Sequence, residues 1–192
     1  MTTLVAYQKK DWAVLGCDSR SAGDDGKYII PKTAKIVDNN GILVGVYGSE
    51  RVANIVHYGF KFPKPRKGQN LYEFMSATFI PKLREEFVRH GVDFTKDEES
   101  IKGSQFDGGL ILAIKGQLFA VASDYSWETS ERGLFYLGTG GDYAVASAVT
   151  AGLEKSKDAG EAAKIIKKAI GVAIDFDNNS GDPIHTFIQS AI

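Results

Sequence analysis

The most constraining feature of this sequence is its regular alternation of paired strand segments with paired helical segments. Tight-turn residues join the strands of each pair, and Asn40-Gly41 is the clearest example, because Asn-Gly favours a two-residue hairpin turn. Strands joined by such short turns must pair antiparallel. Hairpins that alternate with helix pairs therefore predict an α+β fold, in which antiparallel sheets pack together and helices lie outside.

The predicted elements follow from periodicity and from turn residues. The strands are expected at Leu4–Gln8, Trp12–Cys17, Lys35–Val37, Ile42–Tyr47, Gly109–Ile114, Leu118–Ser123, Leu134–Leu137 and His185–Ile192. The helices are expected at Ser49–Tyr58, Leu71–His90, Tyr143–Lys155 and Asp158–Ala173, with Pro81 kinking or restarting the second. We interpret the charged stretch Thr95–Ser104 as a loop, and residues 1–192 as a single domain.

Composition excludes several classes of protein. A chain of 192 residues can bury a core without disulfides or metals. A net charge of -1 argues against a nucleic-acid-binding protein, which would carry a basic stripe. The single cysteine, Cys17, excludes an internal disulfide and fits a reducing compartment. The sequence shows neither a signal peptide nor an apolar stretch of about 18 residues, so we expect a soluble cytoplasmic protein without a membrane partner.

The N-terminus offers a nucleophile and a base on one residue. If Met1 is removed, which the small side chain of Thr2 favours, Thr2 carries both a hydroxyl and a free α-amine. An α-amine titrates at about 7.7–8.0, so it can accept a proton near neutral pH. This is the chemistry of an N-terminal threonine hydrolase. The alternative is that Thr2 only begins a β-strand, which threonine favours.

Further motifs follow Thr2 in a characteristic order. They are Asp18 within Gly16–Arg20, Lys35 at a strand start, Gly45–Gly48 before a helix, Gly138–Gly141 before another, and Asp177–Gly181 before the last strand. In these motifs, and from Thr2 to the last strand, the chain resembles proteasome β-type subunits, the family that includes the bacterial HslV peptidase. The resemblance implies the N-terminal nucleophile (Ntn) hydrolase fold, a four-layer αββα sandwich of two antiparallel sheets flanked by helices.

The resemblance also implies roles for individual residues. Thr2 would be the nucleophile and Lys35 the cation beside its hydroxyl, held in place by Asp18. Lys32 is a rival for the lysine role, and a surface lysine with a turn aspartate is the ordinary alternative. Gly45 would donate its backbone N–H to the oxyanion, unless it is only a packing glycine at a strand end.

A second group of residues is expected around the threonine amine and the substrate. Asp177 and Ser180 match the family pair near the amine, although Asp177–Ser180 could also be a plain polar turn. Thr139 stands where the family usually has serine. Leu43 would form the base of the pocket for the side chain before the cut, and Tyr47 its wall, which predicts cleavage after apolar or aromatic residues.

Other sites are not supported by the sequence. His57, His90 and His185 lack metal-ligand spacing, and Gly138–Gly141 lacks the lysine or the spacing of a nucleotide-binding loop, so we expect no metal and no cofactor. Cys17 is interpreted as a buried strand residue, and the basic loop Lys61–Lys67 as solvated.

The function implied by the resemblance is that of a threonine-type endopeptidase subunit. Its expected partners are unfolded protein or peptide substrates and further copies of itself in a ring, with an ATP-dependent unfoldase as an open option. Two alternatives remain: an Ntn amidohydrolase that acts on small amides, and a catalytically silent structural ring subunit.

Overall fold

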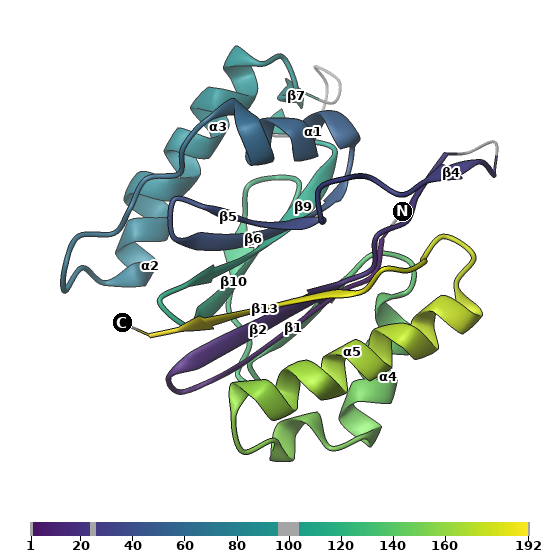
Figure 1. The fold of residues 1–192 in the computed structure, drawn as a ribbon. Helices are drawn as coiled ribbons and strands as arrows, with labels where there is room; N and C mark the ends of the chain where they lie inside the picture. Colours follow the sequence, from purple (N-terminus) through teal and green to yellow (C-terminus); the bar gives the residue numbers. More distant parts are fainter. Residues whose placement is uncertain (1, 24–25, 96–103, 192) are drawn as a thin grey trace.

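The computed structural model describes residues 2–23, 26–95 and 104–191 and contains two main antiparallel sheets (Figure 1). The first sheet has the strand order β12-β1-β2-β13. Its strands are β1 (Leu4–Lys9), β2 (Trp12–Cys17), β12 (Leu134–Leu137) and β13 (His185–Ser190). The second sheet has the order β11-β10-β9-β6-β5. Its strands are β5 (Ile36–Asn39), β6 (Ile42–Gly48), β9 (Gly108–Ile114), β10 (Gln117–Val121) and β11 (Trp127–Glu128).

Helices follow the strands in two groups. The first group comprises α1 (Glu50–Asn54) with the π-helical turn η1 (Ile55–Gly59), then α2 (Leu71–Phe74), the π-helical turn η2 (Met75–Phe79) and α3 (Ile80–Arg89). The second comprises α4 (Gly141–Thr150), the short 3₁₀ turn η3 (Leu153–Lys155) and α5 (Ala159–Phe176). Pro81 stands in the first turn of α3, directly after η2, and the backbone stays helical from α2 into α3. Pro81 therefore follows a π-helical turn and does not interrupt the helix.

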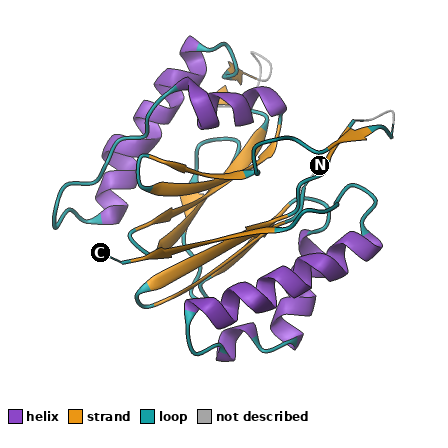
Figure 2. Cartoon of the chain, in the orientation of Figure 1, coloured by secondary structure: helices purple, strands orange, loops and turns teal. Residues whose placement is uncertain are grey.

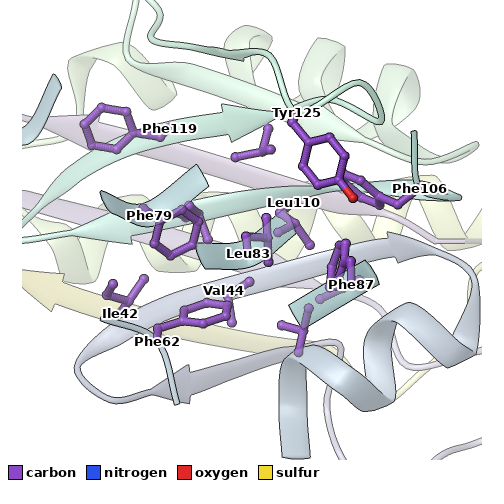
Figure 3. Packing of buried hydrophobic residues seen from close by; sticks show 14 of the residues in the cluster. Ile42, Val44, Phe62, Phe79, Leu83, Phe87, Phe106, Leu110, Phe119 and Tyr125 are labelled. Carbon is purple, nitrogen blue, oxygen red and sulfur yellow. The ribbon is translucent and has the colours of Figure 1, made fainter. Parts of the chain in front are cut away.

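Three hydrophobic clusters hold these elements together. Figures 1 and 2 show α1–α3 over the outer face of the five-stranded sheet, and α4 and α5 over the outer face of the four-stranded sheet. Phe62, Phe79 and Leu83 belong to the first cluster, which packs α1–α3 onto the five-stranded sheet (Figure 3). Ala169 and Ile170 belong to the second cluster, which packs α4 and α5 onto β1 and β2. The third cluster lies between the sheets, with residues such as Leu4, Leu15, Leu43 and Ile111.

The predicted α+β fold with antiparallel hairpins is confirmed, and most element boundaries agree within a few residues. The sequence analysis missed two small hairpins, β3 (Ser21–Ala22) with β4 (Tyr28–Ile29) and β7 (Phe94–Thr95) with β8 (Ser104–Gln105). It also missed β11. A strand of two residues is too short to show a period-two pattern. Residues 96–103 of the predicted loop lie outside the described residues.

Across the described residues, no helix combines the length and the apolar character needed to cross a membrane.

The cluster under α1–α3 predicts a large loss of stability when Phe79 is truncated. This ring is fully buried and lies edge-on against Phe62, with ring centroids 5.0 Å apart. Phe79→Ala should lower the free energy of unfolding by about 3–5 kcal/mol. Val88→Ala, at a position 56% exposed on α3, should change it by no more than about 0.5 kcal/mol. Urea unfolding measures both, and equal losses would contradict the packing described here.

Candidate active site

The chain segments that hold the predicted site residues meet at one end of the two sheets. In the four-stranded sheet Leu4 pairs with both Cys17 and Leu137, and Cys17 also pairs with His185. This register places the start of β1 beside the ends of β2 and β12 and the start of β13. The residues just outside these strands, including Thr2, Asp18, Gly138 and Ser180, are therefore brought together.

Asp18 is the centre of this region. Its side chain is fully buried, and its Oδ1 accepts hydrogen bonds from the Thr3 backbone N–H at 2.8 Å and from Lys35 Nζ at 2.7 Å. Its Oδ2 accepts from the backbone N–H groups of Arg20 and Gly181, both at 3.0 Å. A buried carboxylate needs such partners. Asp18 thereby connects the N-terminal segment, the start of β5 and the loop before β13.

In the structure Asp18 forms its ion pair with Lys35 and not with Lys32. The Lys35 side chain is only 12% exposed, and its ammonium is held by the Asp18 carboxylate just before the start of β5. Lys32 is exposed. This geometry agrees with the Asp18–Lys35 pairing that the family resemblance implied.

A second network of side chains lies on the other side of Thr3. The hydroxyls of Thr3 and Ser180 are 2.6 Å apart, and the Ser180 hydroxyl donates to Asp177 Oδ2 at 2.6 Å. The Thr139 hydroxyl donates to the same oxygen at 2.9 Å. Since the Ser180 proton is committed to Asp177, Thr3 is the donor to Ser180. The sequence analysis named Asp177, Ser180 and Thr139 but missed Thr3, which links both networks.

Hydrogen bonding controls the charge of Asp177. Burial alone would raise its pKa, but the hydrogen bonds from Ser180, Thr139 and Asn179 outweigh burial and lower the pKa below its ordinary value. Asp177 is therefore an anion at neutral pH, and it is fixed in orientation by three neighbouring residues.

The glycines of the Gly138–Gly141 segment allow close packing against the N-terminus. A Cβ at Gly138, whose φ is +85°, would overlap the carbonyl oxygen of Thr2. A Cβ at Gly140 would overlap the hydroxyl of Thr3 and would also approach Asp177 and Ser180. Only glycine leaves room at these two positions. This motif serves close backbone approach, and no phosphate-binding role is needed to explain it.

Thr2 and Lys35 line the same cavity, which has a volume of about 160 Å³. Its other walls come from the segment 31–33, the end of β6 with residues 46–50, and the α1–η1 helix with Ala53, Asn54, His57 and Tyr58. The proposed nucleophile and the proposed cation thus share one opening to solvent. The Thr2 residue itself is 4% exposed.

The structure does not place Gly45 and Leu43 where the sequence analysis expected them. Side chains alternate along a strand, so Leu43, Gly45 and Tyr47 of β6 face the other sheet. A Cβ at Gly45 would lie 3.1 Å from Leu4 and 3.3 Å from Ile36, and Leu43 is buried in the same cluster between the sheets. Neither residue lines the cavity, whereas Tyr47 does. For Gly45, the alternative of a packing glycine fits the structure.

Gly48 has the geometry that was expected of Gly45. The Val46 N–H donates to the Lys35 carbonyl across the β5–β6 pair at 3.1 Å. Because N–H groups alternate between the two neighbours of a strand, the Gly45 N–H is directed toward β9, and the Gly48 N–H is directed to the β5 side, beyond the first residue of β5. Gly48 is exposed, lines the cavity and has a φ of +107°, which favours glycine.

Cys17 does not offer an alternative nucleophile. It is fully buried in β2, and burial, together with the negative charge of Asp18, raises its pKa to about 12. The thiol is therefore protonated at neutral pH, and a thiol in that state is a poor nucleophile. Burial also lowers the pKa of His57, the histidine in the cavity wall, so that its imidazole is neutral.

The described residues contain no group of three or more His, Cys, Asp or Glu side chains placed to hold a metal ion.

Comparison with solved structures shows that the whole chain shares its fold with HslV-like proteins. The BPH protein of Thiobacillus denitrificans superposes with a TM-score of 0.76 at 18% identity, over 99% of this chain and 98% of that one. A structure of the same protein in complex with epoxomicin gives 0.75 at 18% identity, over 99% of both chains. HslV from Trypanosoma brucei gives 0.65 at 20% identity, over 98% of this chain and 99% of that one.

No protein-family model matches the chain, and no curated protein matches its sequence. The similarity in fold to the solved structures nevertheless confirms the resemblance to HslV that the sequence motifs indicated.

The lowered pKa of Asp177 predicts how stability depends on pH. A carboxylate whose pKa is depressed by folding stabilises the native state above its unfolded pKa, and this contribution is lost as the pH falls through the folded value. Asp177→Asn should therefore lower the free energy of unfolding at pH 7, and the difference from the unsubstituted protein should shrink below about pH 4. Urea unfolding at pH 7 and at pH 3.5 tests this.

The matched control is Asp175→Asn, at an exposed position near the end of the same helix. It should have little effect at either pH. A deficit of Asp177→Asn that stayed constant with pH would show that the charge of Asp177 does not contribute.

Proposed function

We propose that this chain is a threonine-type endopeptidase subunit in which Thr2, freed by removal of Met1, is the nucleophile. The observation that carries the proposal is the shared position of Thr2 and Lys35 on one cavity, with Asp18 bound both to Lys35 and to the backbone of Thr3. This arrangement fixes the backbone next to Thr2 and the ammonium relative to the same carboxylate. It places a hydroxyl and a cation at one opening, where the cation favours the ionised form of the hydroxyl and so helps to activate the nucleophile.

In the proposed reaction the Thr2 hydroxyl attacks the carbonyl carbon of a peptide bond. The α-amine of Thr2, directly or through a water molecule, takes the hydroxyl proton and then gives a proton to the departing amine of the substrate as the C–N bond breaks. The Thr2 ester that remains is cleaved by water, which regenerates the hydroxyl and releases the carboxylate product. Lys35 lowers the cost of negative charge that develops beside the hydroxyl.

We propose Gly48, in place of Gly45, as the donor to the oxyanion. Its N–H is directed to the side of β6 on which Lys35 lies, and the residue is part of the cavity wall. An aimed backbone donor of this kind is worth about 2.7–4 kcal/mol in the transition state.

The Asp177–Ser180–Thr139 network is proposed to position the Thr2 amine. It reaches Thr3, the residue next to Thr2, through the Ser180 hydroxyl. The Asp177 carboxylate provides a negative charge that favours the ammonium form between reaction cycles. The hydroxyl acceptors can take a hydrogen bond from the amine in either charge state.

The size of the cavity supports binding of one side chain. A volume of about 160 Å³ is close to that of an engineered protein cavity of about 150 Å³ that binds benzene. The lining includes the apolar or aromatic groups of Val46, Tyr47 and Ala53, with the charges of Lys32 and Glu50 at exposed positions. We therefore keep the proposal that the side chain before the cut is apolar or aromatic, now without a role for Leu43.

Several broader features of the proposal rest on the similarity in fold to Trypanosoma brucei HslV. They are the four-layer αββα arrangement of an Ntn hydrolase, assembly of copies into a ring, unfolded protein as substrate, and a cytoplasmic location. The three separate clusters, one between the sheets and one under each helix group, support the layering. An ATP-dependent unfoldase is a further partner to be tested, and nucleic acid and membrane are not proposed as partners.

Replacing the nucleophile tests the proposal. Thr2→Ala in protein shown by intact mass to lack Met1 should abolish peptide cleavage, because no other group supplies a hydroxyl bonded next to a free amine. Unfolding should be nearly unchanged. Thr33→Ala, which removes another hydroxyl from the cavity wall, should reduce cleavage far less. The measurement is hydrolysis of fluorogenic peptides, and substantial activity of Thr2→Ala would refute the mechanism.

The two lysines of the cavity provide a second test. Lys35→Ala should lower the cleavage rate by at least about a hundredfold, because it removes the main electrostatic stabiliser beside Thr2. Lys32→Ala removes an exposed charge from the same cavity and should cost much less. Rates with saturating peptide distinguish the two variants. A larger loss for Lys32→Ala would reverse the assignment.

A further inference from the structure

A second cavity adjoins the first one at the end of β6. It has a volume of about 390 Å³, and the side chains that matter for its chemistry are Tyr47, Ala120, Ala122, Glu128 and Leu137. Tyr47 lines both cavities, and Leu137 directly precedes Gly138, which lies against the Thr2 carbonyl. The second cavity therefore adjoins the cavity that Thr2 lines, with Tyr47 as the dividing wall.

Strand pairing shows which face of the sheet forms this cavity. Ala120 pairs with Ile111, which faces the space between the sheets, and Ala120 also pairs with Glu128 across β10 and β11. Directly paired residues share a face, so Glu128 lies on the side that faces the other sheet. Here the small side chains of Ala120 and Ala122 do not fill the space, which leaves the cavity open at the sheet edge.

Gly109 allows Tyr47 to form the dividing wall. The two residues pair across β6 and β9, and a Cβ at Gly109 would lie only 2.6 Å from the Tyr47 ring. The ring therefore lies over the glycine, on the side of β9 where β10 runs. This packing fixes the wall in place and separates the two cavities.

The lining of the second cavity has a definite chemical character. Ala120, Ala122 and Leu137 present apolar surface, and the exposed Glu128 presents a carboxylate. Within the part of the chain that the structure describes, the Glu128 side chain makes no ion pair and no hydrogen bond. A long side chain with a cationic end fits this pattern, because its methylene groups cover apolar surface while the charged end stays near solvent.

We propose that this cavity is a second substrate subsite, which binds a lysine or arginine side chain of the peptide through Glu128. The proposal rests on the proposed peptidase function, and it adds a preference at a position other than the one that fills the first cavity. Tyr47 positions the two side chains relative to each other. The enzyme would then select peptides with one apolar or aromatic residue and one basic residue near the cut.

The test measures binding without cleavage. The protein carries Thr2→Ala, and Trp12→Phe leaves Trp127, which lines the cavity, as the only tryptophan. The fluorescence of Trp127 is followed while blocked alanine-based pentapeptides are added. Each peptide contains one phenylalanine and, at one of the other positions, either lysine or the neutral N-acetyl-lysine. At one spacing between lysine and phenylalanine, the lysine peptide should bind about threefold more tightly than the matching acetylated peptide, as expected of an exposed ion pair.

Glu128→Gln should abolish this preference, and Glu131→Gln, at an exposed glutamate outside the cavity, should preserve it. The preference should also weaken with added salt. Equal binding of both peptides at every position, absence of any binding, or a preference that survives Glu128→Gln would overturn the proposal. Since the assay needs no catalysis, these outcomes stay distinct from a failure of Thr2→Ala to abolish cleavage.

Discussion

The buried carboxylate of Asp18 is the interaction on which the site depends. Four donors from separate parts of the chain converge on its two oxygens: the N–H groups of Thr3, Arg20 and Gly181 and the ammonium of Lys35. Removing one partner of a buried ion pair typically costs about 3–5 kcal/mol, since the other charge is left uncompensated. Asp18 therefore ties the N-terminal segment, the β5 strand and the loop before β13 to one point, and it holds Lys35 at the cavity that Thr2 also lines.

Close backbone approach is the second constraint. Gly138 and Gly140 admit the Thr2 carbonyl and the Thr3 hydroxyl at distances that no other residue would allow. The hydrogen bonds from Thr3 to Ser180 and from Ser180 to Asp177 then fix the other side of the same segment. The N-terminal segment is thus held between a charged network and a hydroxyl network. A residue fixed in this way can present its hydroxyl and amine in one orientation, which is what positioning contributes to catalysis.

The sequence was informative where chemistry and spacing coincide. The hairpins followed from turn residues and alternation, and the motifs around Asp18 and Lys35 were specific enough for the family resemblance to imply their pairing. The sequence could not show whether Gly45 or Gly48 is the candidate oxyanion donor. Two glycines three residues apart give no sign of which backbone N–H is hydrogen-bonded to the neighbouring strand. That choice depends on the register between β5 and β6. The same register directs Leu43 into the space between the sheets. Thr3 was missed because its role depends on the contacts of a loop more than 170 residues away.

The most direct test of the account is a crystal structure of the protein without Met1, bound to a peptide boronate. A boronate forms a tetrahedral adduct with the hydroxyl that acts as nucleophile. The account predicts a bond from boron to the hydroxyl oxygen of Thr2, with one boronate oxygen accepting from the Gly48 N–H and Lys35 beside the adduct. A boronate adduct on Thr3 or Ser180 would contradict the assignment of Thr2, and so would a folded protein without Met1 that forms no adduct.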